Sequence, residues 1–173
     1  MDSGDVVARL EKFEGRVPYM CFCTGGEVTV GIGHAIASSA DAARLAWQTN
    51  AASAQSDFAA VAAAPKGLAA THYSSLTTCR MSDDAINQLA TADVQRITAL
   101  LTSNLPNWSS YPAQAALFDM AYNLGIGGLM KSHNLLAAVD AGNRETAAQQ
   151  CHSLGISDAR NQETAALSLH AAG

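Results

Sequence analysis

The first clear pattern of apolar positions lies in residues 6–13, where Val6, Leu10 and Phe13 follow one another at spacings of four and three. This spacing puts them on one face of a helix, so it predicts a short amphipathic helix. Gly15 follows as a natural end for that helix.

A different pattern covers residues 16–36, where aromatic and β-branched residues alternate around Gly25-Gly26. Alternation on both sides of a glycine pair is typical of a β-hairpin whose turn needs positive φ. No other part of the sequence carries a strong β signal.

Helical patterns dominate the remainder of the chain. Ser82 followed by Asp83-Asp84 predicts a helix start, because the hydroxyl caps the first turn and the carboxylates favour the helix dipole. The glycines within residues 125–128 are expected to break another helix. The predicted helices cover residues 41–64 (one or two helices, with Trp47 among their large apolar groups), 82–102, 113–123, 131–141, 143–153 and 158–171, with a loop over 104–112.

Length and composition favour one mainly helical domain. The chain has 173 residues, of which 35 are alanine, a strong helix former. We therefore expect an α+β fold in a single domain over residues 1–173. It would have a small β-hairpin lobe at about 15–36 and a larger helical lobe at about 79–173.

Charge narrows the function. The formal net charge of −5 supplies no basic field for nucleic-acid phosphates, and no apolar run is long enough to cross a bilayer. Residues 1–14 carry charges throughout and leave no room for a secretory signal. We expect a monomer that is made in the cytoplasm, binds no nucleic acid and has no membrane span.

Four cysteines, at positions 21, 23, 79 and 151, are too few and too irregular for a disulfide-built scaffold. Cys21 and Cys23 lie two apart on a predicted strand, so they face one side and cannot easily bridge each other. Either could pair with Cys79 or Cys151, which leaves their redox state open.

Glu14 is the first candidate for chemistry. It stands at a helix-to-strand junction beside apolar Phe13 and Val17, where partial desolvation would raise the pKa of its carboxyl toward that of a general acid. A single glutamate at a helix end is more often a solvated surface residue, so the position alone is weak support.

The residues around the hairpin carry a longer pattern. Glu14-Gly15 is followed by Thr24-Gly25-Gly26-Glu27-Val28-Thr29-Val30-Gly31-Ile32-Gly33-His34. This string resembles the E-G…D-x-x-G-x-x-T-x-G-x-G-H motif of phage-type lysozymes, the endolysins of glycoside hydrolase family 24. Further parts of the family pattern are resembled by residues 82–94, which include Asp93, by residues 115–125, and by the segments Gly155-Ile156, Ala159-Arg160-Asn161 and Ala165-Ala166-Leu167. Residues 38–78 match the pattern least well.

The resemblance implies a lysozyme-like fold with the two lobes flanking a cleft, and a catalytic triad of Glu, Asp and Thr. Glu14 and Thr29 match that triad, but Cys23 stands where the family has aspartate. Glycoside hydrolysis normally pairs an acid with a second carboxylate, so three replacements stay open. They are Cys23 as a thiolate, Thr29 as the group that orients water, and Glu27 on the same hairpin; we favour Cys23 with Thr29.

The resemblance also assigns supporting roles. Arg160 matches the arginine that pairs with the catalytic glutamate, and His34 with Asp93 matches a structural ion pair. Asn123 and Glu27 are candidate substrate-binding residues. No metal or other cofactor is expected, because no second histidine lies at ligand spacing from His34.

The function implied is hydrolysis of the β-1,4 bond between N-acetylmuramic acid and N-acetylglucosamine in bacterial peptidoglycan. One alternative is an inactive peptidoglycan-binding relative that lost its second carboxylate. Another is an amidase or peptidase that uses Cys23 with His34. The protein would reach the cell wall by lysis, by passage through a phage-made hole or by injection, and an injected effector would need an immunity protein as partner.

Overall fold

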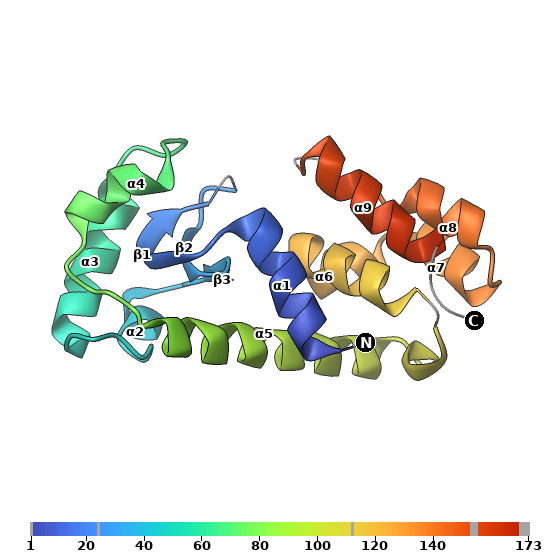
Figure 1. Ribbon diagram of the computed structural model, residues 1–173, viewed down its shortest axis with the longest axis horizontal. Helices are drawn as coiled ribbons and strands as arrows, with labels where there is room; N and C mark the ends of the chain where they lie inside the picture. The colour runs from blue at the N-terminus through green and yellow to red at the C-terminus, as the bar shows by residue number, and fades with distance from the viewer. Residues whose placement is uncertain (1, 24, 112, 153–155, 170–173) are drawn as a thin grey trace. The chain divides into compact units, whose positions relative to one another are not determined.

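The computed structural model describes residues 2–23, 25–111, 113–152 and 156–169 (Figure 1). These residues form an α+β structure that is mainly helical with one small antiparallel sheet, which confirms the predicted fold class. Residues 3–93 make up one compact unit, and residues from Val94 onward belong to a second. Thr24, Gly155 and the predicted helical residues after 169 lie outside the described residues.

The elements of the first unit are α1 (Ser3–Glu14), β1 (Val17–Phe22), β2 (Val28–Gly31), β3 (His34–Ala35), α2 (Ser39–Ala42), α3 (Ala51–Ala63), α4 (Ala70–Tyr73) and the 3-10 helix η1 (Ser74–Leu76). The long helix α5 (Asp83–Asn104) begins in this unit and ends in the second. The second unit continues with the 3-10 helix η2 (Trp108–Ser110), α6 (Gln114–Met130), α7 (His133–Asp140), α8 (Arg144–Gln150) and α9 (Asp158–Leu169).

The sheet has the order β1-β2-β3, so the predicted hairpin is present with a short third strand beside it. Val17 pairs with Gly31 and Cys21 pairs with Thr29. Between these two pairs β1 advances by four residues and β2 by only two, so β1 contains a bulge or irregularity. Pro18 lies in this bulged stretch, where its missing N–H costs no ladder bond. Its carbonyl accepts a 2.8 Å hydrogen bond from the Met81 N–H, which brings the segment before α5 alongside β1.

Helices α3 and α4 pack against β1 (Figure 1). Met20, Cys21 and Phe22 of β1 are buried. Tyr73 is fully buried there, with its ring edge-on to Phe22 at 5.6 Å between centroids. Its hydroxyl donates a 2.7 Å hydrogen bond to the Pro65 carbonyl, which satisfies the polar end of the ring.

One or two helices were predicted over residues 41–64, and the structure has two, α2 and α3, with non-helical chain between them. Trp47 lies between α2 and α3, and its backbone forms an isolated bridge with Met81. Asn50 explains the break, because its side chain accepts from the Ser53 N–H at 2.9 Å and so caps a new helix start.

Asp57 of α3 is a buried carboxylate to which the sequence analysis gave no role. Its Oδ2 accepts hydrogen bonds from the N–H groups of Thr78 at 2.8 Å and Cys79 at 2.7 Å. The carboxylate therefore ties α3 to a loop more than twenty residues further along the chain.

In the second unit, the glycines within residues 125–128 behave differently from the prediction. Gly125 does interrupt α6, with φ of 69° and ψ of 164°, but the chain then resumes helical geometry as far as Met130. The expectation is therefore wrong for Gly127 and Gly128. A Cβ on Gly128 would lie 2.7 Å from that of Leu124, so glycine permits the close turn that follows the break.

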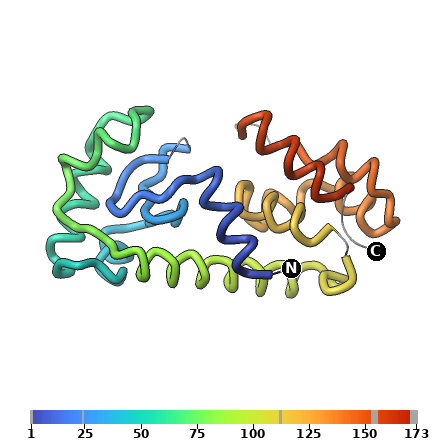
Figure 2. Tube along the Cα trace, in the orientation of Figure 1, coloured from blue at the N-terminus to red at the C-terminus, as the bar shows by residue number. Residues whose placement is uncertain are grey.

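The remaining helices of this unit lie near their predicted positions. Helix α8 packs against α7 and α9, and α6 packs against α9 (Figure 2). The predicted loop over 104–112 contains η2, in which Trp108 is buried. Within the described ranges, no helix combines the length and apolar character needed to cross a bilayer.

Replacing Asp57 should destabilise the protein, because the part-buried Thr78 N–H and the buried Cys79 N–H would lose their charged acceptor. We expect Asp57→Ala to lower the free energy of unfolding by about 2 kcal/mol or more, measured by urea denaturation. The matched control is Gln55→Ala on the exposed face of the same helix, which should change stability by less than about 0.5 kcal/mol. Equal stability of the two variants would contradict a clamping role for Asp57.

Candidate active site

Glu14 is the last residue of α1, as predicted from the apolar spacing. Gly15 follows with φ of +73°, and its N–H donates to the Glu11 carbonyl at 2.9 Å, which closes the helix. The Glu14 carboxyl is half-buried at this junction, three residues before β1 begins.

Arg16 fastens the same junction. Its Nε and Nη2 donate to the two carboxylate oxygens of Glu11 at 2.8 and 2.9 Å, and Nη2 also donates to the Asn87 side chain at 2.8 Å. Nη1 lies 3.5 Å from the Asp83 carboxylate, so α1 and the start of α5 are held together directly beside Glu14. The sequence analysis missed this residue, since nothing in the sequence links Arg16 to Asn87.

The hydrogen bond from Arg16 lowers the pKa of the Glu11 carboxyl below its ordinary 4.5 and outweighs the opposing effect of burial. The same pair raises the pKa of the Arg16 guanidinium. The ion pair is therefore present at neutral pH.

Cys23 lies just beyond β1, at the turn of the hairpin and not within the strand. Its N–H donates to the Glu27 carbonyl at 3.0 Å, and its carbonyl accepts from the Gly26 N–H at 2.9 Å. The Cys23 side chain is half-buried and that of Glu27 is exposed, so both predicted residues border one turn. Gly26 has φ of +79°, a conformation that favours glycine.

Lys66 lies across this turn. A Cβ built on Gly26 would be 3.1 Å from both Cδ and Nζ of Lys66, and the ammonium lies 5.1 Å from the centre of the Phe22 ring. Among the described residues, no carboxylate comes within ion-pair distance of this ammonium. The turn that carries Cys23 therefore has a positive charge beside it, which the sequence analysis did not foresee.

Thr29 is buried on β2 and faces Cys21, its direct partner across the sheet. The Thr29 hydroxyl donates to the Cys21 carbonyl at 3.4 Å, and its oxygen lies 3.7 Å from the Cys21 sulfur. The sequence analysis favoured Cys23 as the working partner of Thr29. In the structure the nearest thiol to Thr29 is that of Cys21, because the register of β1 and β2 carries Cys23 past the end of the strand.

The structure brings His34 and Asp93 together. Nδ1 of His34 on β3 lies 2.7 Å from Oδ2 of Asp93 on α5, and the carboxylate is buried. In its neutral or its charged form the imidazole can donate to this carboxylate, so the pair holds the end of the hairpin against α5.

The four cysteines are free thiols, so neither Cys21 nor Cys23 is bridged to Cys79 or Cys151. Cys79 accepts a hydrogen bond from the Thr49 hydroxyl at 2.8 Å, and Cys151 lies 3.3 Å from the Ser168 hydroxyl. Burial raises the pKa of the Cys21, Cys79 and Cys151 thiols, which keeps them protonated at neutral pH.

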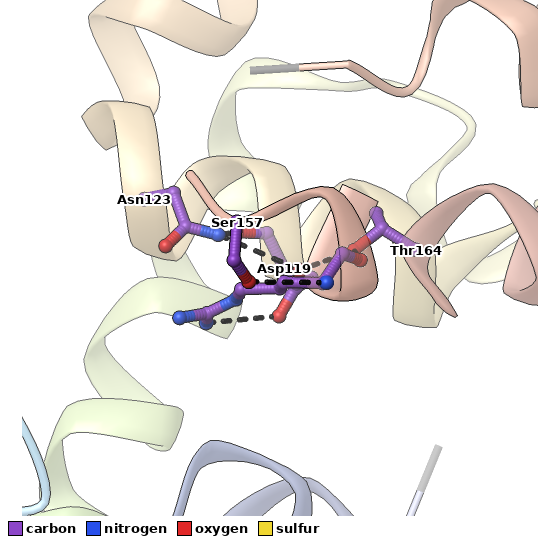
Figure 3. Close-up of polar contacts among 5 residues, drawn as sticks. Asp119, Asn123, Ser157 and Thr164 are labelled. Carbon is purple, nitrogen blue, oxygen red and sulfur yellow. Dashed lines mark hydrogen bonds and ion pairs between the residues drawn. The ribbon is translucent and has the colours of Figure 1, made fainter. Parts of the chain in front are cut away.

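In the second unit, Arg160 of α9 and Asp119 of α6 form a buried ion pair. Nη2 of Arg160 donates to Oδ1 of Asp119 at 3.1 Å, and Nε lies 3.4 Å from Oδ2. The Thr164 hydroxyl donates to the same carboxylate at 2.5 Å (Figure 3). Asp119 is thus a partner of Arg160 that the sequence analysis missed, although a carboxylate on the apolar face of a predicted helix was a signal for a buried pair.

Asn123 lies one helical turn after Asp119. Its Nδ2 donates to the Asp119 carbonyl at 2.8 Å, while its side-chain oxygen points away from Asp119 (Figure 3). The amide is therefore fixed by its own helix, with one acceptor directed elsewhere.

No group of three His, Cys, Asp or Glu side chains within the described ranges is arranged to hold a metal ion. The chemistry of the hairpin rests instead on a carboxyl, a hydroxyl and thiols. A comparison with protein families matches residues 11–168 to the phage lysozyme model. The chain belongs to the phage lysozyme family. Among curated proteins, no sequence matches it.

As a phage lysozyme, the chain is a peptidoglycan hydrolase of the glycoside-hydrolase type. The matched range includes Glu14, the whole hairpin, α5 and Arg160, so it covers both compact units. The three residues predicted to be catalytic, Glu14, Cys23 and Thr29, all lie within the matched range.

The pair of Arg16 and Glu11 should make stability depend on acid pH. Because folding lowers the pKa of Glu11, its contribution is present above the ordinary value of 4.5 and is lost as pH falls through the folded value. We expect Glu11→Gln to be less stable than the parent at pH 7, by less than about 1 kcal/mol since the pair is partly exposed, with the difference closing near pH 3. Thermal melts across this range measure it, with Glu27→Gln as control; a difference independent of pH would contradict the assignment.

The four cysteines should differ in their reactivity toward an alkylating reagent, because they differ in solvent accessibility. Cys23 is half-buried, whereas Cys21, Cys79 and Cys151 are each at most 4% exposed. In the folded protein we expect iodoacetamide to modify Cys23 first, as measured by peptide mass spectrometry, and the other three only after denaturation. Equal labelling of Cys79 and Cys23 in native conditions would be inconsistent with this arrangement.

Proposed function

We propose that this lysozyme hydrolyses the β-1,4 bond between N-acetylmuramic acid and N-acetylglucosamine in peptidoglycan. Glu14 donates its proton to the glycosidic oxygen, so that the leaving sugar departs as an alcohol. Thr29 holds the water that attacks the anomeric carbon. The Cys23 thiolate either stabilises the positive charge that develops there or forms a carbon–sulfur bond, which the same water then breaks to free the thiolate. Glu14 recovers a proton from that water when the cycle ends.

The observation that carries this proposal is the position of the three residues within one compact unit that the family match covers. Glu14 ends the helix that leads into the hairpin, Thr29 lies on β2, and Cys23 is at the hairpin turn. Arg16 fastens the glutamate's helix end to α5, which supports a fixed place for the acid. A general acid must be held in position, because proton transfer needs a hydrogen-bond geometry.

Cys23 can serve as an anionic group only as a thiolate. Lys66 places a positive charge beside the same turn, where it would attract an anionic group. Glu27, at the far end of the turn, is a second source of negative charge and stays the alternative to Cys23.

An inactive, peptidoglycan-binding relative is the second candidate, and the substitution at Cys23 is the observation that favours it. An amidase that uses Cys23 with His34 is disfavoured by the sheet register. Cys23 lies past Phe22, the residue of β1 that pairs with Val28 at the start of β2. His34 pairs with Val30 further along β2, and its side chain contacts Asp93 at hydrogen-bond distance. Within the described residues Cys23 has no side-chain hydrogen bond, so the cysteine and histidine are not a working pair.

The test is a set of variants assayed on purified peptidoglycan for release of reducing sugar. Glu14→Gln should lose about 10²–10⁴-fold in kcat, the usual contribution of a general acid. Cys23→Ala should lose about 10²-fold if the thiolate stabilises charge, and Cys23→Asp should keep or exceed the parent activity.

Asp84→Asn, on an exposed part of α5, is the matched control and should keep full activity. Full activity of Glu14→Gln would refute the mechanism. Full activity of Cys23→Ala would exclude Cys23 from the mechanism, and Glu27→Gln would then be tested in the same assay. Binding of peptidoglycan without any sugar release by the parent protein would establish the inactive candidate, and release of free peptide would establish an amidase.

A further inference from the structure

The Thr29 hydroxyl makes polar contacts with Cys21. The two residues are direct partners across β1 and β2, and their side chains are only 4% and 7% exposed. Two contacts join them: Thr29 Oγ1 to the Cys21 carbonyl oxygen at 3.4 Å, and Thr29 Oγ1 to the Cys21 sulfur at 3.7 Å.

The protons available on the hydroxyl and the thiol decide which atom donates in each of these two contacts. A threonine hydroxyl has one proton and two lone pairs. Because a carbonyl oxygen can only accept, the Thr29 proton goes to the Cys21 carbonyl. The thiol keeps its own proton, since burial raises its pKa, and that proton is left to donate to Thr29 Oγ1. One lone pair on Oγ1 then remains.

We infer that Cys21 is a positioning residue for the proposed hydrolysis, and that its thiol orients the Thr29 hydroxyl as an acceptor for the attacking water. A water that donates one hydrogen to Thr29 turns an oxygen lone pair outward, toward the anomeric carbon. This inference rests on the proposed function, in which Thr29 places the water. Cys21 itself does not touch the substrate.

Side-chain substitution isolates the thiol. The backbone carbonyl of Cys21 survives every change at this position, so only the contact from the sulfur is lost. Cys21→Ala removes the donor, whereas Cys21→Ser replaces the thiol with a hydroxyl that can still donate. Cys79 offers a matched control in the same unit, because it is also buried and lies 2.8 Å from a threonine hydroxyl, that of Thr49.

The experiment measures kcat, KM and melting temperature on purified peptidoglycan for Cys21→Ala, Cys21→Ser, Cys79→Ala, Thr29→Val and the double variant Cys21→Ala with Thr29→Val. We expect Cys21→Ala to lower kcat about tenfold with KM changed less than about twofold, as for an interaction that matters mainly in the transition state. Cys21→Ser should recover most of kcat. Cys79→Ala should keep kcat although it loses comparable stability.

Double-variant coupling separates the role from packing alone. If Cys21 acts through Thr29, adding Cys21→Ala to Thr29→Val should lower kcat no further. Three results would each overturn the inference, provided that Thr29→Val stays impaired. In the first, Cys21→Ala has the same kcat as Cys79→Ala; in the second, Cys21→Ser has no higher kcat than Cys21→Ala. In the third, the losses of kcat in the double variant are fully additive. Full activity of Thr29→Val is the separate result that would refute the proposed role of Thr29 and the inference with it.

Discussion

The pairing of β1 with β2 sets the place of each candidate catalytic group on the hairpin. Between the residues that pair with Gly31 and Thr29, β1 is two residues longer than the matching stretch of β2. That extra length puts Cys21 opposite Thr29 and carries Cys23 out to the turn. Because side chains alternate faces along a strand, a slip of one residue would turn Thr29 and Cys21 to the other face of the sheet.

Much of this lysozyme could be predicted from its sequence, and the reason is local. The spacing of Val6, Leu10 and Phe13 gave α1, the alternation around Gly25-Gly26 gave the hairpin, and Ser82 gave the start of α5, where its hydroxyl accepts from the Ala85 N–H at 3.2 Å. Each of these signals depends on residues close together in the chain. The resemblance to the family then located Glu14 and Thr29 on those elements.

What could not be predicted depends on distant partners. Three features arise only when segments far apart in the sequence meet. They are the β-bulge beside Pro18, the contact of Lys66 with Gly26, and the ion pair of Asp119 with Arg160. The two buried aspartates also differ in how their charge is met. Asp57 accepts from backbone N–H groups, whereas Asp119 is paired with a guanidinium and a hydroxyl, as a buried carboxylate requires.

Residues 38–78 supply apolar cover for the sheet through α3 and α4. Lys66 reaches from this segment to the turn, and Asp57 binds it to the chain that leads into α5. Without α3 and α4, β1 would expose Met20 and Phe22 to water, at a cost in hydrophobic free energy. The segment that contains α3 and α4 and the hairpin therefore form one packing unit, so a substitution at their shared surface affects both parts.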